Sequence, residues 1–304
     1  MPEWYEGDGW FPSEFGASDE MGTLNLVDQR KVLRALSIPK RGRVYRLAHE
    51  IYNGMPGRTQ FHGPFFYLIS QRVYDHRPPF RKPAVNRFGG ALGRLEMSDH
   101  AGTHIDALNH IAVGNRYYNG IDAFDVTGTQ GTTRLGIDKT PPIVTRGIMV
   151  DVASALGVDI LEKGHAITVD EAKRFLRDHS LSIEAGDAVF FHTGISRLWE
   201  NPSEYNTYYE SSPGVGYELA KYLASLHVSV VGADVPSTEV EPAEIEGARL
   251  PVHQYLIAKS GIRMIDNMKL DEVSRDRVYE FLFLCSPLPI RGGTASPVAP
   301  VAVS

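Results

Sequence analysis

Alternating hydrophobic and polar positions along the chain predict a series of short strands. Runs rich in β-branched and aromatic residues lie between turns that contain Gly, Pro and Asn. Two of these runs, residues 143–152 and 228–234, are rich in Val and other apolar residues, which is typical of buried strands. Five further strands are predicted at residues 43–51, 65–69, 94–97, 186–194 and 262–266.

Helical periodicity appears in three stretches between these strands. Asp28 is a typical N-cap for a short helix over residues 29–36. The run Thr-Val-Asp-Glu from Thr168 is a capping box, which predicts a second helix. Over residues 214–227, Leu and Tyr recur on one helical face. Because the strands are separated by both loops and helices, without regular βαβ alternation, we predict one mixed α/β domain.

The first 27 residues differ from the rest in being rich in Trp, Phe, Gly and acidic residues. Trp4, Trp10 and Phe15 are among several aromatic side chains that are too large for a free tail. We therefore expect an N-terminal arm, residues 1–27, that packs on the domain or on a neighbouring subunit. The remaining residues, 28–304, are expected to form a single domain.

The composition is that of an ordinary globular protein, with 304 residues of which 42% are hydrophobic and 22% charged. A formal net charge of −6, without a Lys/Arg cluster, argues against a nucleic-acid partner. No apolar run approaches the roughly 20 residues of a membrane helix, so no membrane partner is expected. The N-terminus lacks the apolar core of a signal peptide. Cys285 is the only cysteine and lies in an apolar run, so we expect a buried, inert thiol in a cytoplasmic protein.

Histidines cluster between residues 99 and 110, where the chain reads Asp-His-Ala-Gly-Thr-His-Ile-Asp-Ala-Leu-Asn-His. In an extended segment, residues two apart share a face, so His100, His104 and Asp106 would point the same way. On a helix, Asp106 would point away from the two histidines. We therefore predict an extended segment that turns into a helix just after Asp106, with His110 on its first turns.

This side-chain set suits a divalent metal ion. Imidazole nitrogens and a carboxylate are common ligands of zinc, manganese and iron(II), and His100, His104 and Asp106 would leave coordination positions open for water and substrate. His110 would then serve as a general acid or base. The alternative is that core or surface histidines cluster here by chance. The number of histidines in this short run and their even spacing disfavour that alternative. We expect one or two ions of Mn²⁺ or Zn²⁺, since such ligands suit both metals.

Residues 100–110 resemble the HxGTHxDxxxH signature of the metal-dependent cyclase family, which includes bacterial kynurenine formamidase and isatin hydrolase. Weaker resemblance extends from about residue 19 to residue 302. It implies a layered β/β/α swivelling-domain fold, cyclase-like, around a barrel-like sheet. It also implies a homodimer or homotetramer, with the N-terminal arm as a contact.

The same resemblance draws attention to His253 and Asp266. Family members carry a His after "LP" and, about a dozen residues later, an acid in "xxENL", and use both for metal binding. Asp266 stands where Glu is usual and is shorter by one methylene group. Two arrangements stay open. Either His253 and Asp266 bind a second metal ion that Asp106 bridges, or one ion binds at the first cluster and His253 transfers a proton.

Other candidate residues surround these clusters. Asp234 lies at the end of a predicted buried strand, a position where α/β folds often carry functional residues. We expect Asp234 to contact the metal-binding residues and not the metal itself. Four aromatic residues could hold a flat substrate ring: Phe65, Phe66, Tyr117 and Tyr118. The two tyrosines are equally compatible with positions in the hydrophobic core.

These observations predict a metal-dependent hydrolase. The resemblance implies that it cleaves an amide, cyclic amide or lactone bond in a small aromatic or cyclic substrate. Metal-activated water would attack the carbonyl carbon, and His110 would move the proton to the leaving group. A metal-dependent cyclase or dehydratase that stabilises an enolate is the first alternative. A non-catalytic protein that binds a metal or an aromatic ligand is the second.

Overall fold

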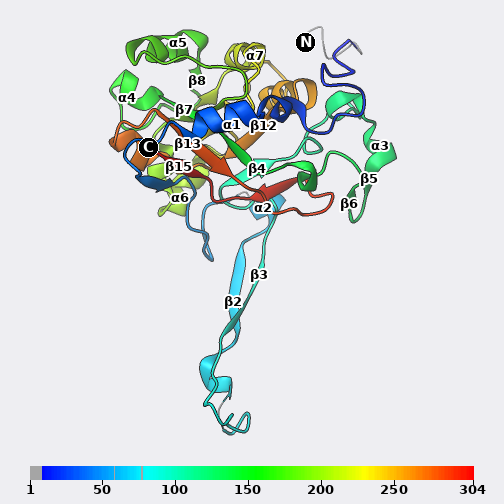
Figure 1. The fold of residues 1–304 in the computed structure, drawn as a ribbon, viewed down its shortest axis with the longest axis vertical. Coiled ribbons are helices and arrows are strands. Elements are labelled where there is room, and N and C mark those ends of the chain that lie inside the picture. Colours follow the sequence, from blue (N-terminus) through cyan, green and yellow to red (C-terminus); the bar gives the residue numbers. More distant parts are fainter. Residues whose placement is uncertain (1–8, 58, 77) are drawn as a thin grey trace.

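A curled nine-stranded sheet forms the centre of the molecule (Figure 1). The computed structural model describes residues 9–57, 59–76 and 78–304. The central strands β7, β9, β11 and β12 run parallel, and antiparallel strands flank them on both sides. In spatial order the strands are β1 (Val44–Arg46), β15 (Val301–Val303), β13 (Glu280–Cys285), β7 (Ile143–Asp151), β9 (Ala188–His192), β11 (Val230–Ala233), β12 (Arg263–Asp266), β4 (His104–Asp106) and β14 (Ala295–Pro297).

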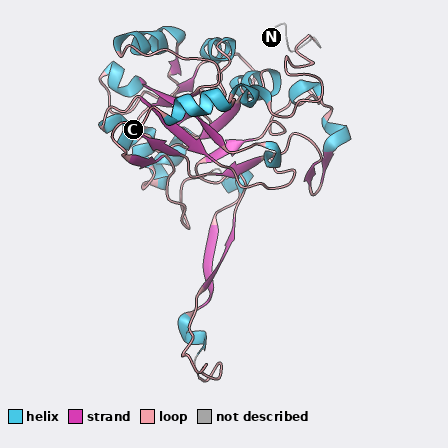
Figure 2. Cartoon of the chain, in the orientation of Figure 1, coloured by secondary structure: helices cyan, strands magenta, loops and turns pink. Residues whose placement is uncertain are grey.

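Both faces of the central strands are covered. Successive side chains of a strand point to opposite faces, so Val189 and Phe191 enter one hydrophobic core while Ala188 and Phe190 enter another. The first core lies under helices α4 (Val152–Leu156), α5 (Val169–Asp178) and α7 (Tyr217–Ser225) (Figure 2). Burial on both faces explains why these strands are rich in apolar residues. The mixed α/β prediction is confirmed.

The predicted helix starts are confirmed by their hydrogen bonds. Asp28 caps α1 (Gln29–Leu36) by accepting the backbone N–H of Lys31. Thr168 and Glu171 form the capping box of α5. The N-caps satisfy backbone donors that have no partner inside the helix, which is why the sequence marks these positions clearly.

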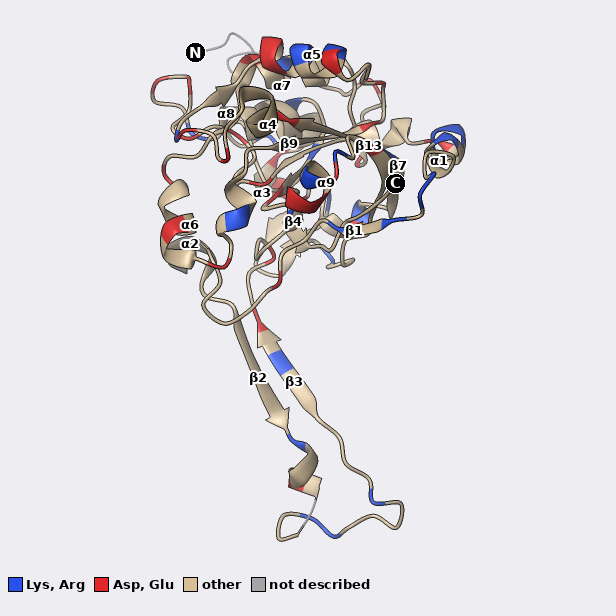
Figure 3. Cartoon of the chain, turned by 90° about the vertical axis from the view of Figure 1, so that its left-hand side faces the viewer, with Lys and Arg blue, Asp and Glu red and all other residues tan. Residues whose placement is uncertain are grey.

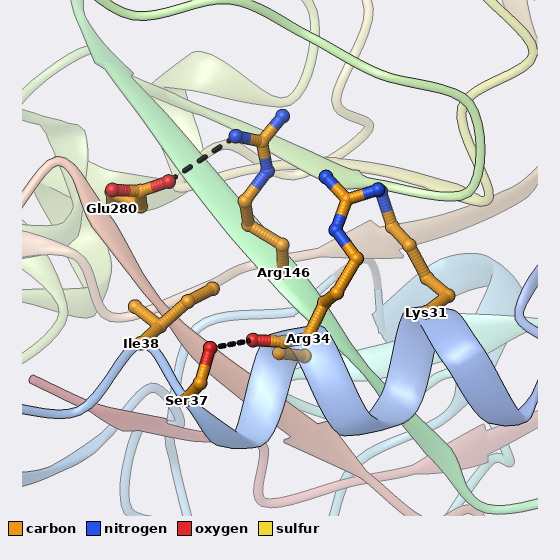
Figure 4. A pocket seen from close by; sticks show the side chains of 7 residues that line it. Lys31, Arg34, Ser37, Ile38, Arg146 and Glu280 are labelled. Carbon is orange, nitrogen blue, oxygen red and sulfur yellow. Dashed lines mark hydrogen bonds and ion pairs between the residues drawn. The ribbon is translucent and has the colours of Figure 1, made fainter.

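An ionic cluster fixes α1 to the sheet. Asp187 is fully buried and binds Lys31 of α1 and Arg146 of β7. Figure 4 shows a pocket at this contact, where Arg146 also reaches Glu280, 3.2 Å from Nη1 to Oε1. Because its basic groups are paired with carboxylates, we interpret this pocket as part of the structural contact of α1.

The predicted helix after Asp106 is wrong. Residues 107–117, all described, form a turn and loops in place of a helix. The turn is closed by the His110 N–H, which donates to the Ala107 carbonyl, 3.1 Å. The Ala107 N–H donates to the Thr294 carbonyl, and the Asn109 side chain donates to Thr132. These residues therefore form hydrogen bonds with distant segments of the chain, and not with one another in a helix.

The extended segment is also shorter than predicted. Only His104–Asp106 form a strand, and His100 lies in the turn before it. Gly102 makes that turn with φ of 62°, a left-handed conformation that favours glycine. His100 therefore approaches His104 because the chain bends between them, and the simple two-residue alternation holds only for His104 and Asp106.

Short helices connect the larger elements. The short α-helices are α2 (Thr59–His62), α3 (Ala123–Val126), α6 (Pro202–Tyr205), α8 (Pro251–His253) and α9 (Asp271–Arg275). The 3₁₀ segments are Gly22–Leu26, Val73–His76, Tyr118–Gly120, Ile137–Lys139, Ile195–Leu198 and Asn206–Tyr208, and a π-helical segment covers Gln254–Lys259. Small sheets pair β5 (Thr127–Gly128) with β6 (Gly131–Thr132) and β8 (Ala166–Ile167) with β10 (Gly214–Val215). Among the described residues, the structure has no helix that is both long and apolar enough to span a membrane.

One hairpin projects far from the body of the molecule (Figure 1). It is formed by β2 (Phe66–Gln71) and β3 (Leu92–Glu96), which pair only with each other within the described sheets. We call residues 65–97 the hairpin arm.

The described part of the N-terminal segment, residues 9–27, packs on its own domain. Tyr118 Oη donates to Asp19 Oδ2, 2.8 Å, and the Ser13 N–H donates to the Asn119 side chain, 2.8 Å. Trp4 lies outside the described residues.

Candidate metal centre

The two predicted clusters meet at one buried place. Strand β4 carries His104 and Asp106, and β12 lies beside it with Asp266 opposite His104 in the antiparallel register. The third contributor is α8, which begins with Pro251 in its first turn and ends at His253. Although up to 166 positions separate them in sequence, His100 and Asp266 therefore lie in one site.

Asp106 lies at the centre of the site. Its side chain is buried, and neither carboxylate oxygen has a hydrogen-bond partner among the described residues. His100 Nε2 is 3.5 Å from Oδ1, and His253 Nε2 is 3.8 Å from Oδ2. Buried carboxylate oxygens without partners are costly, so this arrangement calls for a positive charge between the side chains.

Two groups of side chains share Asp106. His100, Asp106 and His110 form one group, and Asp106, His253 and Asp266 form the other. Within each group, the candidate ligand atoms lie within 4.8 Å of one another. Because Asp106 belongs to both groups, it could contribute to the binding of one ion or of two.

His104 lies between the two carboxylates. Its Nε2 is 3.8 Å from Asp106 Oδ1 and 3.6 Å from Asp266 Oδ2. The sequence analysis grouped His104 with His100 and left His110 outside. In the structure, His110 Nδ1 is 3.0 Å from His100 Nε2 and His110 completes the first group.

Hydrogen bonds fix which nitrogen each histidine presents. The Nδ1–H of His104 donates to the Gly102 carbonyl, 2.9 Å, and the Nδ1–H of His100 donates to Asp99, 2.9 Å. His253 Nδ1 likewise bonds to Glu239. In all three rings Nδ1 is held by a hydrogen bond and Nε2 faces the cluster, which is the usual orientation of metal-ligating histidines.

Burial sets the electrostatics of the centre. It raises the pKa of Asp106 and, together with the charge of Asp106, raises the pKa of Asp266 to about 7. Burial lowers the pKa of His104 to about 3. Two adjacent buried carboxylates resist ionisation unless a cation compensates them. The donor set of nitrogens and oxygens therefore fits a divalent metal ion.

Asp266 reaches the cluster despite its short side chain. Thr238 Oγ1 donates to Asp266 Oδ1, 2.6 Å, which leaves Oδ2 facing His104. Because β12 lies directly beside β4, the missing methylene group relative to Glu does not take Asp266 out of the site.

A match to known families identifies the chain. A model of the putative cyclase family covers residues 45–240, well over half of the chain. The chain belongs to this family. The predicted membership of the cyclase family is thereby confirmed.

Individual proteins support the same assignment of this cyclase-family chain. A kynurenine formamidase of Geobacillus thermodenitrificans is 29% identical over 241 residues, which span 76% of this chain and 93% of that protein. A crystal structure described as a novel cyclase superposes with a TM-score of 0.85 at 24% identity and covers 96% of this chain and 98% of that one. Isatin hydrolase A from Ralstonia solanacearum superposes with a TM-score of 0.65 at 19% identity. The match covers 86% of this chain and 92% of that protein. Both structures share the cyclase-like fold.

Two carboxylates that orient histidines were missed by the sequence analysis. Asp99 accepts from His100 through Oδ1, and its Oδ2 accepts the side-chain hydroxyl of Thr294, 2.8 Å. Its position next to the signature histidine could have suggested it. Glu239 accepts from the ring of His253 and from the backbone N–H of Val252, 3.1 Å. No local motif points to Glu239, because this contact depends on the tertiary fold.

The four predicted aromatic residues do not gather at the centre. Phe65 lines a cavity beside His100, whereas Phe66 is exposed on the hairpin arm. Tyr117 packs against the hydrophobic core, and Tyr118 is buried beneath the N-terminal segment. The sequence analysis missed other residues of the cavity, whose lining includes Met55, Pro56, His62, Phe65, His100 and Tyr209. The ring of His62 stacks on His100 with 5.6 Å between centroids.

Asp234 lies in a separate buried cluster. It accepts the backbone N–H of Thr193, 2.8 Å, and of Gly194, 2.9 Å. Its neighbour His192 donates from Nδ1 to Asp151, 2.8 Å. Asp151 and His192 end strands β7 and β9, and Asp234 directly follows β11. Among the described residues, the hydrogen bonds of these three side chains do not reach the histidines of the candidate metal centre.

The charge of His192 should make stability depend on pH. Burial alone would lower the pKa of His192. The interactions with the Asp151 and Asp271 carboxylates outweigh this effect and raise the pKa to about 10. The usual value is 6.5, so the stabilisation is fully present below pH 6.5 and is lost as the pH rises toward 10. We expect the free energy of unfolding in urea to fall from pH 7 to pH 9.5, and to fall less in His192→Asn.

The control for this prediction is His227→Asn. His227 is about half exposed, so this variant should keep the pH dependence of the original chain. Equal slopes for His192→Asn and the original chain would show that His192 is not charged in the folded state.

Proposed function

We propose that the chain is a metal-dependent hydrolase that cleaves an amide, cyclic amide or lactone bond in a small aromatic or cyclic substrate. The observation that carries the proposal is the Asp106 carboxylate, buried without hydrogen-bond partners between two sets of ligand atoms. The relatives support the reaction class, since they include a kynurenine formamidase and an isatin hydrolase.

The residues that would hold the metal are His100, His104, Asp106, His253 and Asp266. Mn²⁺ and Zn²⁺ both suit this set, as one or two ions. A divalent ion bound there lowers the pKa of water and polarises a substrate carbonyl group.

The remaining chemistry belongs to the chain's own side chains. His110 is partly buried and lies within the cluster, so its ring can accept a proton and return it to the leaving group. Asp99 and Glu239 hold the rings of His100 and His253 in one orientation. The rings of Phe65 and His62 lie at the cavity beside His100 and would hold a flat substrate group.

A cyclase or dehydratase is the second candidate. The family model and one similar structure are described as cyclases, which favours this reaction over simple ligand binding. Turnover in water enriched in oxygen-18 separates the two reactions. A hydrolase places the label in the acid product, whereas a cyclase does not.

Metal removal tests the main proposal. After treatment with a chelator and dialysis, we expect hydrolysis of a formyl amide, a cyclic amide or a lactone to fall to about 5% of its starting rate, and Mn²⁺ or Zn²⁺ to restore it. Chelator-treated protein that is reloaded with Mg²⁺ serves as the control, because Mg²⁺ prefers oxygen ligands. Full activity in metal-free protein would refute the mechanism.

The proposal extends to the setting of the reaction. We propose that residues 28–304 act as one catalytic domain in the cytoplasm. The sequence has a single cysteine, Cys285, and therefore no internal disulfide, which suits a reducing compartment.

A further inference from the structure

Asn267 directly follows the proposed ligand Asp266, at the point where the chain leaves β12. Its φ of 53° is left-handed, a conformation that Asn adopts more readily than most residues with a side chain. The residue is buried, and its backbone N–H donates to the Val235 carbonyl, 2.9 Å. The chain therefore bends sharply next to the candidate metal centre, and a hydrogen bond to the segment after β11 fixes the bend.

Two further hydrogen bonds join Asn267 to the turn before β4. Its Nδ2–H donates to the Gly102 carbonyl, 3.1 Å, and its own carbonyl accepts the hydroxyl of Thr103, 2.5 Å. The Gly102 carbonyl also accepts the Nδ1–H of His104, 2.9 Å. Asn267 and His104 therefore donate to the same oxygen atom, so the Asn267 amide fixes the acceptor that orients the His104 ring.

Tyr205, which ends α6, holds the Asn267 amide in place. A backbone carbonyl can only accept, so the amide nitrogen of Asn267 must face Gly102 and its oxygen must face away. That oxygen accepts the hydroxyl of Tyr205, 2.6 Å. Tyr205 is fully buried, although α6 lies at the side of the body (Figure 3). Both ends of the Asn267 amide are thus bonded, which restricts its rotation.

The segment that contains Tyr205 also supports the cavity beside His100. Asn206 Oδ1 accepts the backbone N–H of Gly57, 3.1 Å, and Gly57 and Tyr209 both line that cavity. The rings of Tyr205 and Tyr209 lie 6.1 Å apart between centroids. Loss of the Tyr205 hydroxyl alone would leave these contacts of the cavity wall in place.

We propose that Asn267, held by Tyr205, is a positioning residue that keeps Nε2 of His104 directed toward Asp106 and Asp266. This inference rests on the proposed function, because it assigns a role toward a ligand of the proposed hydrolase. A ring that is already held in one orientation loses little rotational freedom when an ion binds. Asn267 therefore strengthens metal binding through His104, without itself serving as a ligand.

Asn267→Gly tests the proposal, because glycine keeps the left-handed bend and removes the amide. Metal-free protein is titrated with Zn²⁺ in competition with a chelating dye. We expect the dissociation constant for Zn²⁺ to rise by about 10–100-fold, the usual cost of removing a group that orients a ligating histidine.

Asn119→Gly is the matched control. Asn119 is also buried and left-handed, with φ of 61°, and its side chain donates to the Gly16 carbonyl, 2.8 Å, at the N-terminal segment. This variant should lose stability in urea but keep the Zn²⁺ affinity of the original chain. A comparable loss of affinity in both variants would show a general effect of destabilisation and would overturn the assignment.

Tyr205→Phe is the gentler variant and decides the question if Asn267→Gly does not fold. We expect its dissociation constant for Zn²⁺ to rise about 10-fold and its kcat with saturating metal to fall by a similar factor, with KM unchanged because the cavity wall stays intact. Tyr45→Phe removes another buried hydroxyl, which donates to Asp276, 3.0 Å, and should alter none of these values.

The metal titration separates this inference from the proposed function. Folded variants that bind Zn²⁺ as tightly as the original chain would overturn the positioning role and leave the proposed hydrolase intact. An original chain that binds neither Zn²⁺ nor Mn²⁺ would refute the proposed metal site, and the role of Asn267 with it.

Discussion

Asp106→Asn is expected to abolish metal binding and to lower kcat/KM at least 1,000-fold, which corresponds to about 4 kcal/mol of transition-state stabilisation. The substitution keeps the size of the side chain and removes its charge. Asp106 is the only residue common to both ligand groups, and its oxygens have no other partner among the described residues. An amide is a far weaker metal ligand than a carboxylate, so both groups would lose their shared member.

The measurement combines metal analysis by mass spectrometry with steady-state kinetics. Asp170→Asn is a suitable control, because Asp170 is exposed at the start of α5 and far from the site in sequence. It should keep the metal content and activity of the original chain. Because burial raises the pKa of Asp106, the neutral amide should not destabilise the metal-free fold. Retention of metal by Asp106→Asn would remove Asp106 from the ligand set.

His110→Ala is expected to retain the metal and to lower kcat by 10²–10⁴-fold, the usual contribution of a general acid or base. The turn that follows β4 places His110 Nδ1 within 3.0 Å of His100 Nε2, next to the ligands. Its side chain could therefore serve as a proton-transfer group or as a ligand. The expected result follows from the five other side chains, which supply enough donors for an ion without His110.

His100→Ala is the matched comparison for this prediction. It makes the same substitution at a residue that we assign as a ligand, and it should lose metal as well as activity. If His110→Ala lost metal to the same extent, His110 would be a ligand and the proton would have to move through another group. A His110→Ala variant with normal kcat would exclude both roles.

The sequence located the candidate metal centre but did not reveal how distant segments build it. Spacing and residue type pointed to His100, His104 and Asp106 as candidate ligands because these residues lie close together in the sequence. The helix expected after Asp106 failed to form, since Ala107 and Asn109 bond to segments far along the chain. Glu239 could not be found at all, because its contact with His253 depends on how α8 packs.

The fold likewise has features that neighbouring residues determine and features that depend on contacts between distant segments. The capped helices that begin after Asp28 and Thr168 were predicted correctly from neighbouring residues. Strands were expected at residues 65–69 and 94–97, close to β2 and β3. Their pairing into a projecting arm was not expected, because strand patterns do not say which strands meet or whether a core covers them.

The pairing of β4 sets the order of events when the protein is made. Asp99 is anchored by Thr294, which lies 195 residues further along the chain, and β4 pairs with β12 and β14 alone among the described strands. At about 5–20 residues per second, a ribosome needs roughly 10–40 s to add that length. The signature histidines therefore leave the ribosome long before the strands that hold them exist. The proposed metal ion would therefore find its complete set of ligands only after the last part of the chain has been synthesised.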